Sequence, residues 1–287
     1  MRLYKTVAYI AVDLDTGERI VYDGADDAGR MLHIDFDVTK STGSTPNTGT
    51  VLVYNLSETD RSLISDSGLR VSLYLGYDGN ADLISVADID TVVSLQTGVD
   101  WVTEFKLGEG QKALQSKQNR TYREGTDAQI IVKQLAEDAG LVVNNTIATV
   151  KGLVSGSLTL EGTTQGALND IGSELDVEFN VQNDELFITL PDGIADDEAA
   201  VIAPDTGLIG YPEFTAKGVN FKAQVQPGVI PGKVIKLESE GYVIESGQTS
   251  KKIEGRDDSG FYVCQTVKFQ GNNYGGDFYV DVEARAL

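Results

Sequence analysis

The chain contains one histidine and one cysteine, so imidazole or thiol chemistry would have to use His33 or Cys264. A Ser–His–Asp triad needs His33 as its base, and a thiol dyad needs both residues. His33 stands at the start of a strand-like segment, which is typical of an edge or loop histidine. Cys264 lies in the alternating segment Tyr262–Gln265, which favours a packing role. A single cysteine also excludes an intramolecular disulfide and a thiolate zinc site.

Carboxylates are abundant, but their spacing indicates no defined site. Asp35 and Asp37 would share one strand face, as a glycosidase pair could, yet such pairs arise by chance among 44 acidic residues. Asp13–Asp15 and Tyr77–Asp82 could offer oxygen ligands to calcium, but each lacks part of the loop and is typical of a turn. Gly108–Gly110 lacks the pattern of a dinucleotide site. We therefore predict no catalytic, cofactor-binding or metal-binding residues and a protein that is not an enzyme.

The charge balance limits the classes of partner. The 287 residues include 23 Lys plus Arg and 44 Asp plus Glu, a formal net charge of −21. Such a surface repels phosphates, which argues against specific nucleic-acid binding. It could serve solubility alone, or a conduit through which DNA slides without sticking. Neither a signal-peptide pattern nor a long apolar run occurs, so we expect synthesis in the cytoplasm and no membrane insertion.

Strand patterns dominate residues 1–120. A hairpin is predicted at 4–22, and period-two alternation places Ile34, Phe36 and Val38 on one face of a half-buried strand. The polar stretch Lys40–Thr48 predicts a loop or a wide hairpin, and Ser57 is expected to cap a short helix that ends near Gly68. Further strands are expected at 50–56, 69–77, 83–95 and 101–107. Together they predict a barrel-like closed sheet.

Helical spacing appears in residues 125–192. Thr126 is expected to cap a helix that ends at Gly140, and Thr163 to open a second helix. Extended segments are predicted at 141–143 and 157–160, with a hairpin at 177–190 around the turn Asn183-Asp184. This segment predicts a small α+β module.

The last segment returns to strand patterns. Residues 191–206 are acidic, contain proline and indicate a connector at a domain boundary. A second barrel-like domain is expected at 205–287. Its strands are predicted at 217–225, 233–238, 241–244, 261–269 and 277–284, with a glycine-rich turn at 271–276. The predicted fold class is therefore mainly β, with two β-barrel-like domains flanking a small α+β insert.

Three stretches carry a resemblance to a known family. Residues 207–232 contain GLIGYPEFT, KGVNF and QPGVIPG in that order, residues 267–279 read VKFQGNNYGGDFY, and residues 37–57 end in YNLS. Proline fixes φ where the chain turns, and glycine permits the tight geometry. In type and order these segments resemble the baseplate hub proteins of contractile-tailed phages, such as the Mu-like hub proteins.

The resemblance implies a structural baseplate or tail hub protein that assembles as a ring, a homotrimer. Two barrel-like domains per subunit would give the ring pseudo-sixfold symmetry. The ring would join the tail tube proteins to the central spike protein, and DNA would pass through its lumen without specific binding. The protein would then belong to the virion, in the tail baseplate. A distal-tail or tail-completion relative stays open because the chain is short for the family.

Two other functions stay open. The chain could be a virion receptor- or carbohydrate-binding β-domain protein that uses Trp101 and Tyr274 as exposed stacking residues, although core or hairpin packing is the favoured role of both aromatics. It could also be a carboxylate-based cell-wall hydrolase.

Overall fold

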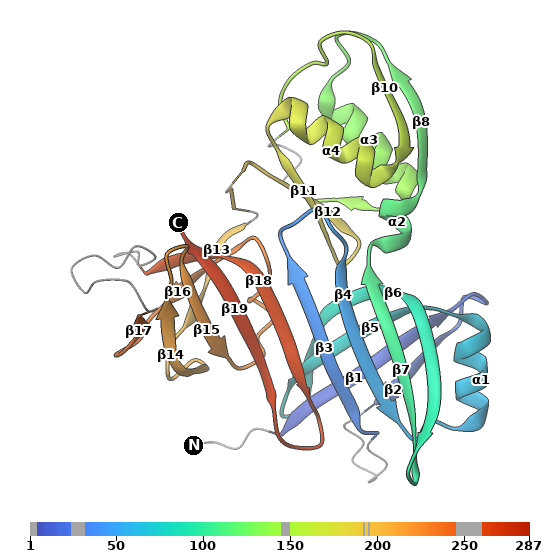
Figure 1. Ribbon diagram of the computed structural model, residues 1–287, viewed down its shortest axis with the longest axis vertical. Coiled ribbons are helices and arrows are strands. Elements are labelled where there is room, and N and C mark those ends of the chain that lie inside the picture. Colours follow the sequence, from blue (N-terminus) through green and yellow to red (C-terminus); the bar gives the residue numbers. More distant parts are fainter. Residues whose placement is uncertain (1–4, 24–31, 145–149, 192, 195, 245–259) are drawn as a thin grey trace.

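The computed structural model describes residues 5–23, 32–144, 150–191, 193–194, 196–244 and 260–287 (Figure 1). The described residues are mainly β, with a smaller α+β part that projects at one end of the longest axis. The fold is therefore a large sheet that carries an inserted module.

Within the described residues, fourteen strands from both ends of the chain form one sheet. The N-terminal segment contributes β1 (Thr6–Leu14), β2 (Arg19–Asp23), β3 (Ile34–Ser41), β4 (Asn47–Tyr54), β5 (Gly68–Tyr77), β6 (Asn80–Thr97) and β7 (Asp100–Glu109), with helix α1 (Glu58–Ser67) between β4 and β5. The C-terminal segment contributes β13 (Asp196–Ile202), β14 (Leu208–Phe214), β15 (Val219–Ala223), β16 (Lys233–Leu237), β17 (Val243–Ile244), β18 (Phe261–Asn272) and β19 (Phe278–Ala286).

The two segments join where β18 pairs antiparallel with β3, placing Phe269 opposite Val38. The strand order is β17-β14-β15-β19-β18-β3-β4-β7-β6-β5-β1-β2, and β16 pairs with both β18 and β13. Figure 1 shows β3 and β18 side by side although they lie at opposite ends of the sequence. One sheet therefore unites the N-terminal and C-terminal segments.

Alternating side chains of this sheet form one apolar core. Ile34, Phe36 and Val38 are buried, as the period-two pattern predicts. Residues of β3 share a single buried cluster with Val267 and Phe269 of β18. Burying such side chains stabilises the fold by roughly 1.5–3 kcal/mol each. The core thus continues across the junction between the two segments.

The insert has its own elements and its own core. It comprises α2 (Gln111–Gln115), β8 (Lys117–Tyr122), α3 (Ala128–Ala139), β9 (Val142–Val143), β10 (Leu158–Thr163), α4 (Thr164–Leu175), β11 (Glu178–Gln182) and β12 (Glu185–Thr189). β8 pairs with β10, and β11, β12 and β9 form a second small sheet in that order. Ile131 and Leu135 of α3 and Leu168 and Ile171 of α4 pack into a separate buried cluster.

Most predicted elements are confirmed, including the mainly β fold class, its α+β insertion and the hairpins β1–β2 and β11–β12. The Ser57 side chain accepts from Asp60 N at the start of α1, and Gly68 is the C-cap of that helix. Thr163 likewise caps α4, and its side chain accepts from Gly166 N.

Two local predictions were wrong, and the bounds of a third were too wide. Helix α3 is capped by Asp127 and not by Thr126, because the Asp127 carboxylate accepts from Gln129 N at 2.8 Å. The connector 191–206 contains β13, which is held by parallel pairing with β16, a tertiary contact that local composition does not encode. The hairpin alternative at Lys40–Thr48 is confirmed by the antiparallel pairing of β3 with β4, but its turn is shorter than predicted, since β3 extends to Ser41 and β4 begins at Asn47. Strands β8 and β14 were not predicted as separate elements.

Candidate functional site

Polar side chains occupy the core-facing positions at one end of three neighbouring strands. Lys40 follows Val38 on the buried face of β3, and Glu109 follows Leu107 on the buried face of β7. Asn47 begins β4 directly opposite Glu109. All three are at most 5% exposed. The apolar core of the large sheet therefore ends in a buried polar layer beneath the insert.

Lys40 and Glu109 form the charged centre of this layer. The Lys40 Nζ lies 3.1 Å from Glu109 Oε1, and it also donates to the Ile84 carbonyl at 2.8 Å. Asn47 Nδ2 donates to Glu109 Oε2 at 2.7 Å. Each buried charge thus has an opposite charge and further hydrogen bonds, which a buried ion pair needs to offset desolvation.

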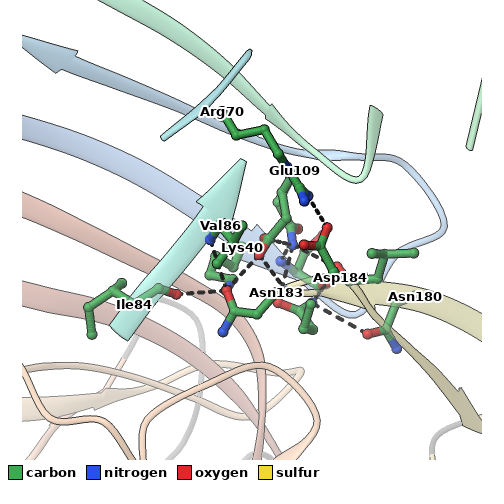
Figure 2. Close-up of polar contacts among 12 residues, drawn as sticks. Lys40, Arg70, Ile84, Val86, Glu109, Asn180, Asn183 and Asp184 are labelled. Atoms are coloured by element: carbon green, nitrogen blue, oxygen red, sulfur yellow. Dashed lines mark hydrogen bonds and ion pairs between the residues drawn. The ribbon is translucent and has the colours of Figure 1, made fainter. Parts of the chain in front are cut away.

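The turn of the β11–β12 hairpin docks on this polar layer (Figure 2). Asn183 N donates to Glu109 Oε1 at 2.6 Å, and Asn183 Oδ1 accepts from Lys40 Nζ at 3.1 Å and from Val86 N at 3.1 Å. Asn183 and Asp184 have φ values of 52° and 67°, which fits a two-residue type I′ turn. The turn residue Asn183, which the hairpin needs for its positive φ, therefore also supplies the backbone N–H and side-chain oxygen that bind the insert to the sheet.

Side-chain amides and a second ion pair make further contacts between the insert and the large sheet. Gln182 Nε2 donates to the Ser41 carbonyl at 2.8 Å, and Asn47 Nδ2 donates to Gln182 Oε1 at 3.2 Å. Arg70 of β5 pairs with Asp184 of the turn, as Figure 2 shows, and lies 3.6 Å from Asp88. We call this set the polar junction: Lys40, Asn47, Arg70, Asp88, Glu109, Gln182, Asn183 and Asp184.

The polar junction is suited to fixing the orientation of the insert. The buried apolar residues of the sheet and of the insert fall into two separate clusters, while directional hydrogen bonds and ion pairs connect them. Charge-assisted hydrogen bonds have narrow geometry, so they specify one orientation more strongly than apolar contact does. The arrangement positions one module on another, and its charged groups are paired with each other.

Sequence reasoning missed the polar junction because Lys40 and Asn47 were assigned to a loop or wide hairpin and Glu109 was considered only as part of a glycine pattern. A usable signal was present. Lys40 extends the period-two pattern of Ile34, Phe36 and Val38 by one step, so the pattern predicts that its side chain is buried. A buried lysine needs an acidic or hydrogen-bonding partner.

The two candidate residues for imidazole and thiol chemistry lie far apart. Asn272 of β18 pairs with Asp35 beside His33, whereas Cys264 lies eight residues before Asn272 in β18, which corresponds to about 26 Å. Cys264 is fully buried, and burial raises the pKa of its thiol to about 12. The predicted packing role of Cys264 is confirmed.

His33 belongs to a small polar and aromatic cluster at the surface. Its ring stacks on Tyr54 with centroids 4.3 Å apart, and its Nε2 lies 2.8 Å from Asp35 Oδ1. Tyr54 donates to Asp35 Oδ2 at 3.0 Å, and burial followed by this hydrogen bond raises the pKa of the phenol. Asp37 pairs instead with Lys268 at 2.9 Å, so the two carboxylates have different partners.

The acidic segments considered for calcium are turns or strand ends. Asp78 and Gly79 have φ values of 54° and 86° and form the turn between β5 and β6. Asp13 pairs with Arg19 across the β1–β2 hairpin, and this hydrogen bond lowers the pKa of the Asp13 carboxyl. Among the residues that the structure describes, no three His, Cys, Asp or Glu side chains gather closely enough to hold a metal ion.

The two aromatic candidates for ligand stacking are both partly exposed. Trp101 is 36% exposed, and the Arg61 guanidinium lies 4.0 Å over its ring. Tyr274 is 70% exposed in the β18–β19 turn and tilts over His33 with centroids 5.4 Å apart. Each therefore has one face against a protein group. In the described part of the chain, no helix combines the length and apolar character needed to span a membrane.

The fold is similar to solved phage tail proteins. A 43 kDa tail protein of prophage MuSo2 from Shewanella oneidensis matches with a TM-score of 0.62 and 9% identity, covering 96% of this chain and 97% of that one. A tail protein from Neisseria meningitidis MC58 matches with a TM-score of 0.61 and 9% identity, covering 97% and 96%.

A third similar structure belongs to a secretion system. The E. coli c3393 protein is a type VI secretion component with structural similarity to the T4 tail proteins gp27 and gp5. It matches with a TM-score of 0.57 and 12% identity, covering 90% of this chain and 75% of that one. At these identities the likeness concerns the fold. No curated protein is similar enough in sequence to count as a relative. The model of the baseplate hub gp41 family matches residues 70–284, well over half of the chain, and we conclude that the chain belongs to that family.

Proposed function

We propose that this chain is a structural, non-enzymatic hub subunit that assembles as a homotrimeric ring between the tail tube and the central spike of a phage baseplate. Membership of the baseplate hub family carries the proposal. The continuous sheet supports it, because each subunit places an N-terminal and a C-terminal β-rich half side by side across β3 and β18. Three such subunits would present six β-rich units to a sixfold tube and three insert modules to a threefold partner.

Within this proposal we retain two barrel-like domains, predicted at 1–120 and 205–287, around the insert predicted at 125–192. Residues 111–122, which form α2 and β8, go with the insert, because Leu114 and Tyr122 belong to its buried cluster. The two halves share one core, so the proposal concerns two similar units for assembly and does not require that either half folds alone. Removing residues 205–287 should therefore leave an aggregating protein, because β3 would lose its partner β18. A monodisperse, folded 1–204 fragment would contradict the shared-core argument.

The mass in solution tests the ring. Light scattering of the purified chain should give about three times the 30.8 kDa monomer mass, and dilution should preserve that value if the interfaces are extensive. A self-contained monomer at all concentrations would overturn the trimer. An image of the assembled particle with this chain between tube and spike would test both partners and the location in the virion.

Sheet edges are the proposed contact sites. Strand β2 ends the strand order, and its Val21 side chain is 56% exposed. A Val21→Lys variant should weaken the ring, since a charge on an edge strand opposes strand pairing. Thr121→Lys on the exposed face of β8 adds the same charge and serves as the matched control. Equal trimer stability in both variants would remove β2 from the interface.

The net charge of −21 supports a lumen that DNA crosses without binding. A gel-shift assay at physiological salt should show no complex with duplex DNA, whereas a saturable complex would contradict this part of the proposal. Incubation with peptidoglycan should release no fragments, and turnover there would contradict the non-enzymatic assignment.

A further inference from the structure

A cleft of about 530 Å³ lies between the insert and the large sheet, apart from the polar junction. Its walls come from the C-terminal half of α4, the start of β11 and the turn Thr42–Ser44 that joins β3 to β4. Gln265 of β18 and Pro191 complete the lining. This volume falls within the usual range of ligand sites, about 300–1,000 Å³. The cleft is therefore large enough for several residues of a bound segment.

Strand β11 presents to this cleft the side of its backbone that faces away from β12. In the order β11-β12-β9 it is an outer strand of its sheet. In the two-residue hairpin the pair Gln182–Glu185 closes the turn, so Gln182, Asn180 and Glu178 direct their backbone groups toward β12. The backbone N–H and C=O groups of the intervening residues, Phe179 and Val181, must then point away from β12.

Two hydrogen bonds support this outward direction. The Val181 carbonyl accepts from Asn47 Nδ2 at 3.2 Å, and Val177 N donates to the Gly172 carbonyl at 3.0 Å. Phe179 lies between these two residues and lines the cleft. Its backbone N–H and C=O are therefore oriented to pair with an added strand.

The charge around the cleft is negative. Asp176 and Glu178 line it and are exposed, and none of its lining residues is a lysine or arginine. The C-terminal end of α4, a helix of 12 residues capped by Asp176, lies in the same wall. A helix C-terminus carries partial negative charge, so it adds to the potential of the two carboxylates.

We infer that this cleft binds an extended segment of another protein that carries lysine or arginine, with the segment added as a strand beside β11. Main-chain pairing at Phe179 would supply affinity, and the carboxylates of Asp176 and Glu178 would select the basic side chain. A second copy of this chain is a poor source of such a basic segment, because the chain has 44 acidic residues against 23 basic ones. The inference does not require the ring described above.

Fluorescence anisotropy with a labelled Lys-Val-Lys-Val-Lys peptide and the full chain tests the inference. Saturable binding is expected, with slower amide hydrogen exchange at Phe179. Asp176→Asn combined with Glu178→Gln should weaken binding about five-fold, by loss of two partly exposed charge pairs. Asn is compatible with the left-handed φ of 53° at position 176, so this variant should fold normally.

Two matched controls separate strand addition in the cleft from general attraction to an acidic protein. Glu161→Gln combined with Glu213→Gln removes the same charge outside the cleft and should leave binding unchanged. A peptide of the same sequence with alternate N-methylated backbone should bind much more weakly, because it keeps its charges but cannot pair with β11.

Equal binding of the methylated peptide, or equal weakening by the control variant, would overturn the inference. If the chain self-associates and the peptide dissociates the complex, the inference is also overturned, because the cleft is then occupied by a second copy of the chain.

Discussion

Replacing Lys40 by methionine tests the polar junction most directly. Lys40→Met keeps an unbranched side chain of similar volume but removes the cation beside Glu109, which is 1% exposed. The carboxylate would keep its hydrogen bonds from Asn47 Nδ2 at 2.7 Å and from Asn183 N at 2.6 Å. Removing one partner of a buried pair typically costs 3–5 kcal/mol. Because two donors remain, we expect a loss of about 3 kcal/mol in the free energy of unfolding.

The matched control removes both charges. In Lys40→Met combined with Glu109→Gln, the amide oxygen still accepts from Asn183 N and no buried charge lacks a partner, although the new amide nitrogen faces the Asn47 Nδ2 donor. Much of the cost of breaking a buried ion pair comes from the charge that is left unpaired, and the double variant removes that charge. The double variant should therefore regain about 1 kcal/mol relative to Lys40→Met, an interaction energy expected of groups in direct contact.

Urea denaturation followed by two signals measures these values. Far-ultraviolet circular dichroism reports the whole chain, and fluorescence of Trp101, the only tryptophan, reports the large sheet. Hydrogen exchange at Asn183 and Asp184 should rise in Lys40→Met and return toward the original rate in the double variant. If Lys40→Met costs under about 1 kcal/mol, or if the double variant is no more stable than the single one, the buried pair does not hold the insert as argued.

Further predictions concern three other positions. Asn183→Ala should be about 1 kcal/mol less stable than Asn183→Gly in urea denaturation, because both lose the side-chain acceptor but only alanine is strained at φ 52°. Gly110→Ala should lower the free energy of unfolding by about 1–3 kcal/mol, because the new Cβ would lie 2.8 Å from Val181 Cγ1 and alanine is strained at the backbone φ of 66°. Adding Val181→Ala should relieve the steric clash but not the backbone strain. Cys264 should resist alkylation at pH 8 until the chain unfolds, because its thiol pKa is about 12. Relative to Cys264→Ala, the thiol's contribution to stability should be complete below its ordinary pKa of 9.0 and fall as pH rises toward about 12.

Local patterns predicted the strands and caps that local chemistry determines. The alternation of Ile34, Phe36 and Val38 sets the buried face of β3, and Ser57 and Thr163 cap their helices through their own hydroxyls. The turn Asn183-Asp184 was predicted for the same reason, since both residue types tolerate positive φ. These features depend on neighbours within a few residues.

Features that depend on distant partners were not predictable in the same way. The pairing of β18 with β3 joins positions more than 200 residues apart, and β13 is ordered by β16. The polar junction was predictable only in part. The register of β3 predicts that Lys40 is buried, but its partners come from β7 and from a hairpin 143 residues away. A buried charge in a strand pattern therefore signals that a partner exists without identifying it.

The position of Lys40 also explains why a turn, and not an apolar face, connects the two cores. An apolar contact between insert and sheet would tolerate sliding, because its free energy depends on buried area and hardly on direction. Asn183 instead satisfies Lys40, Glu109 and Val86 N at once, so displacing the turn would leave buried donors and acceptors unpaired. Any displacement of the turn is thus opposed by the desolvation of buried charges. In the proposed ring, such a joint would hold every insert at the same angle to the sheet that carries it.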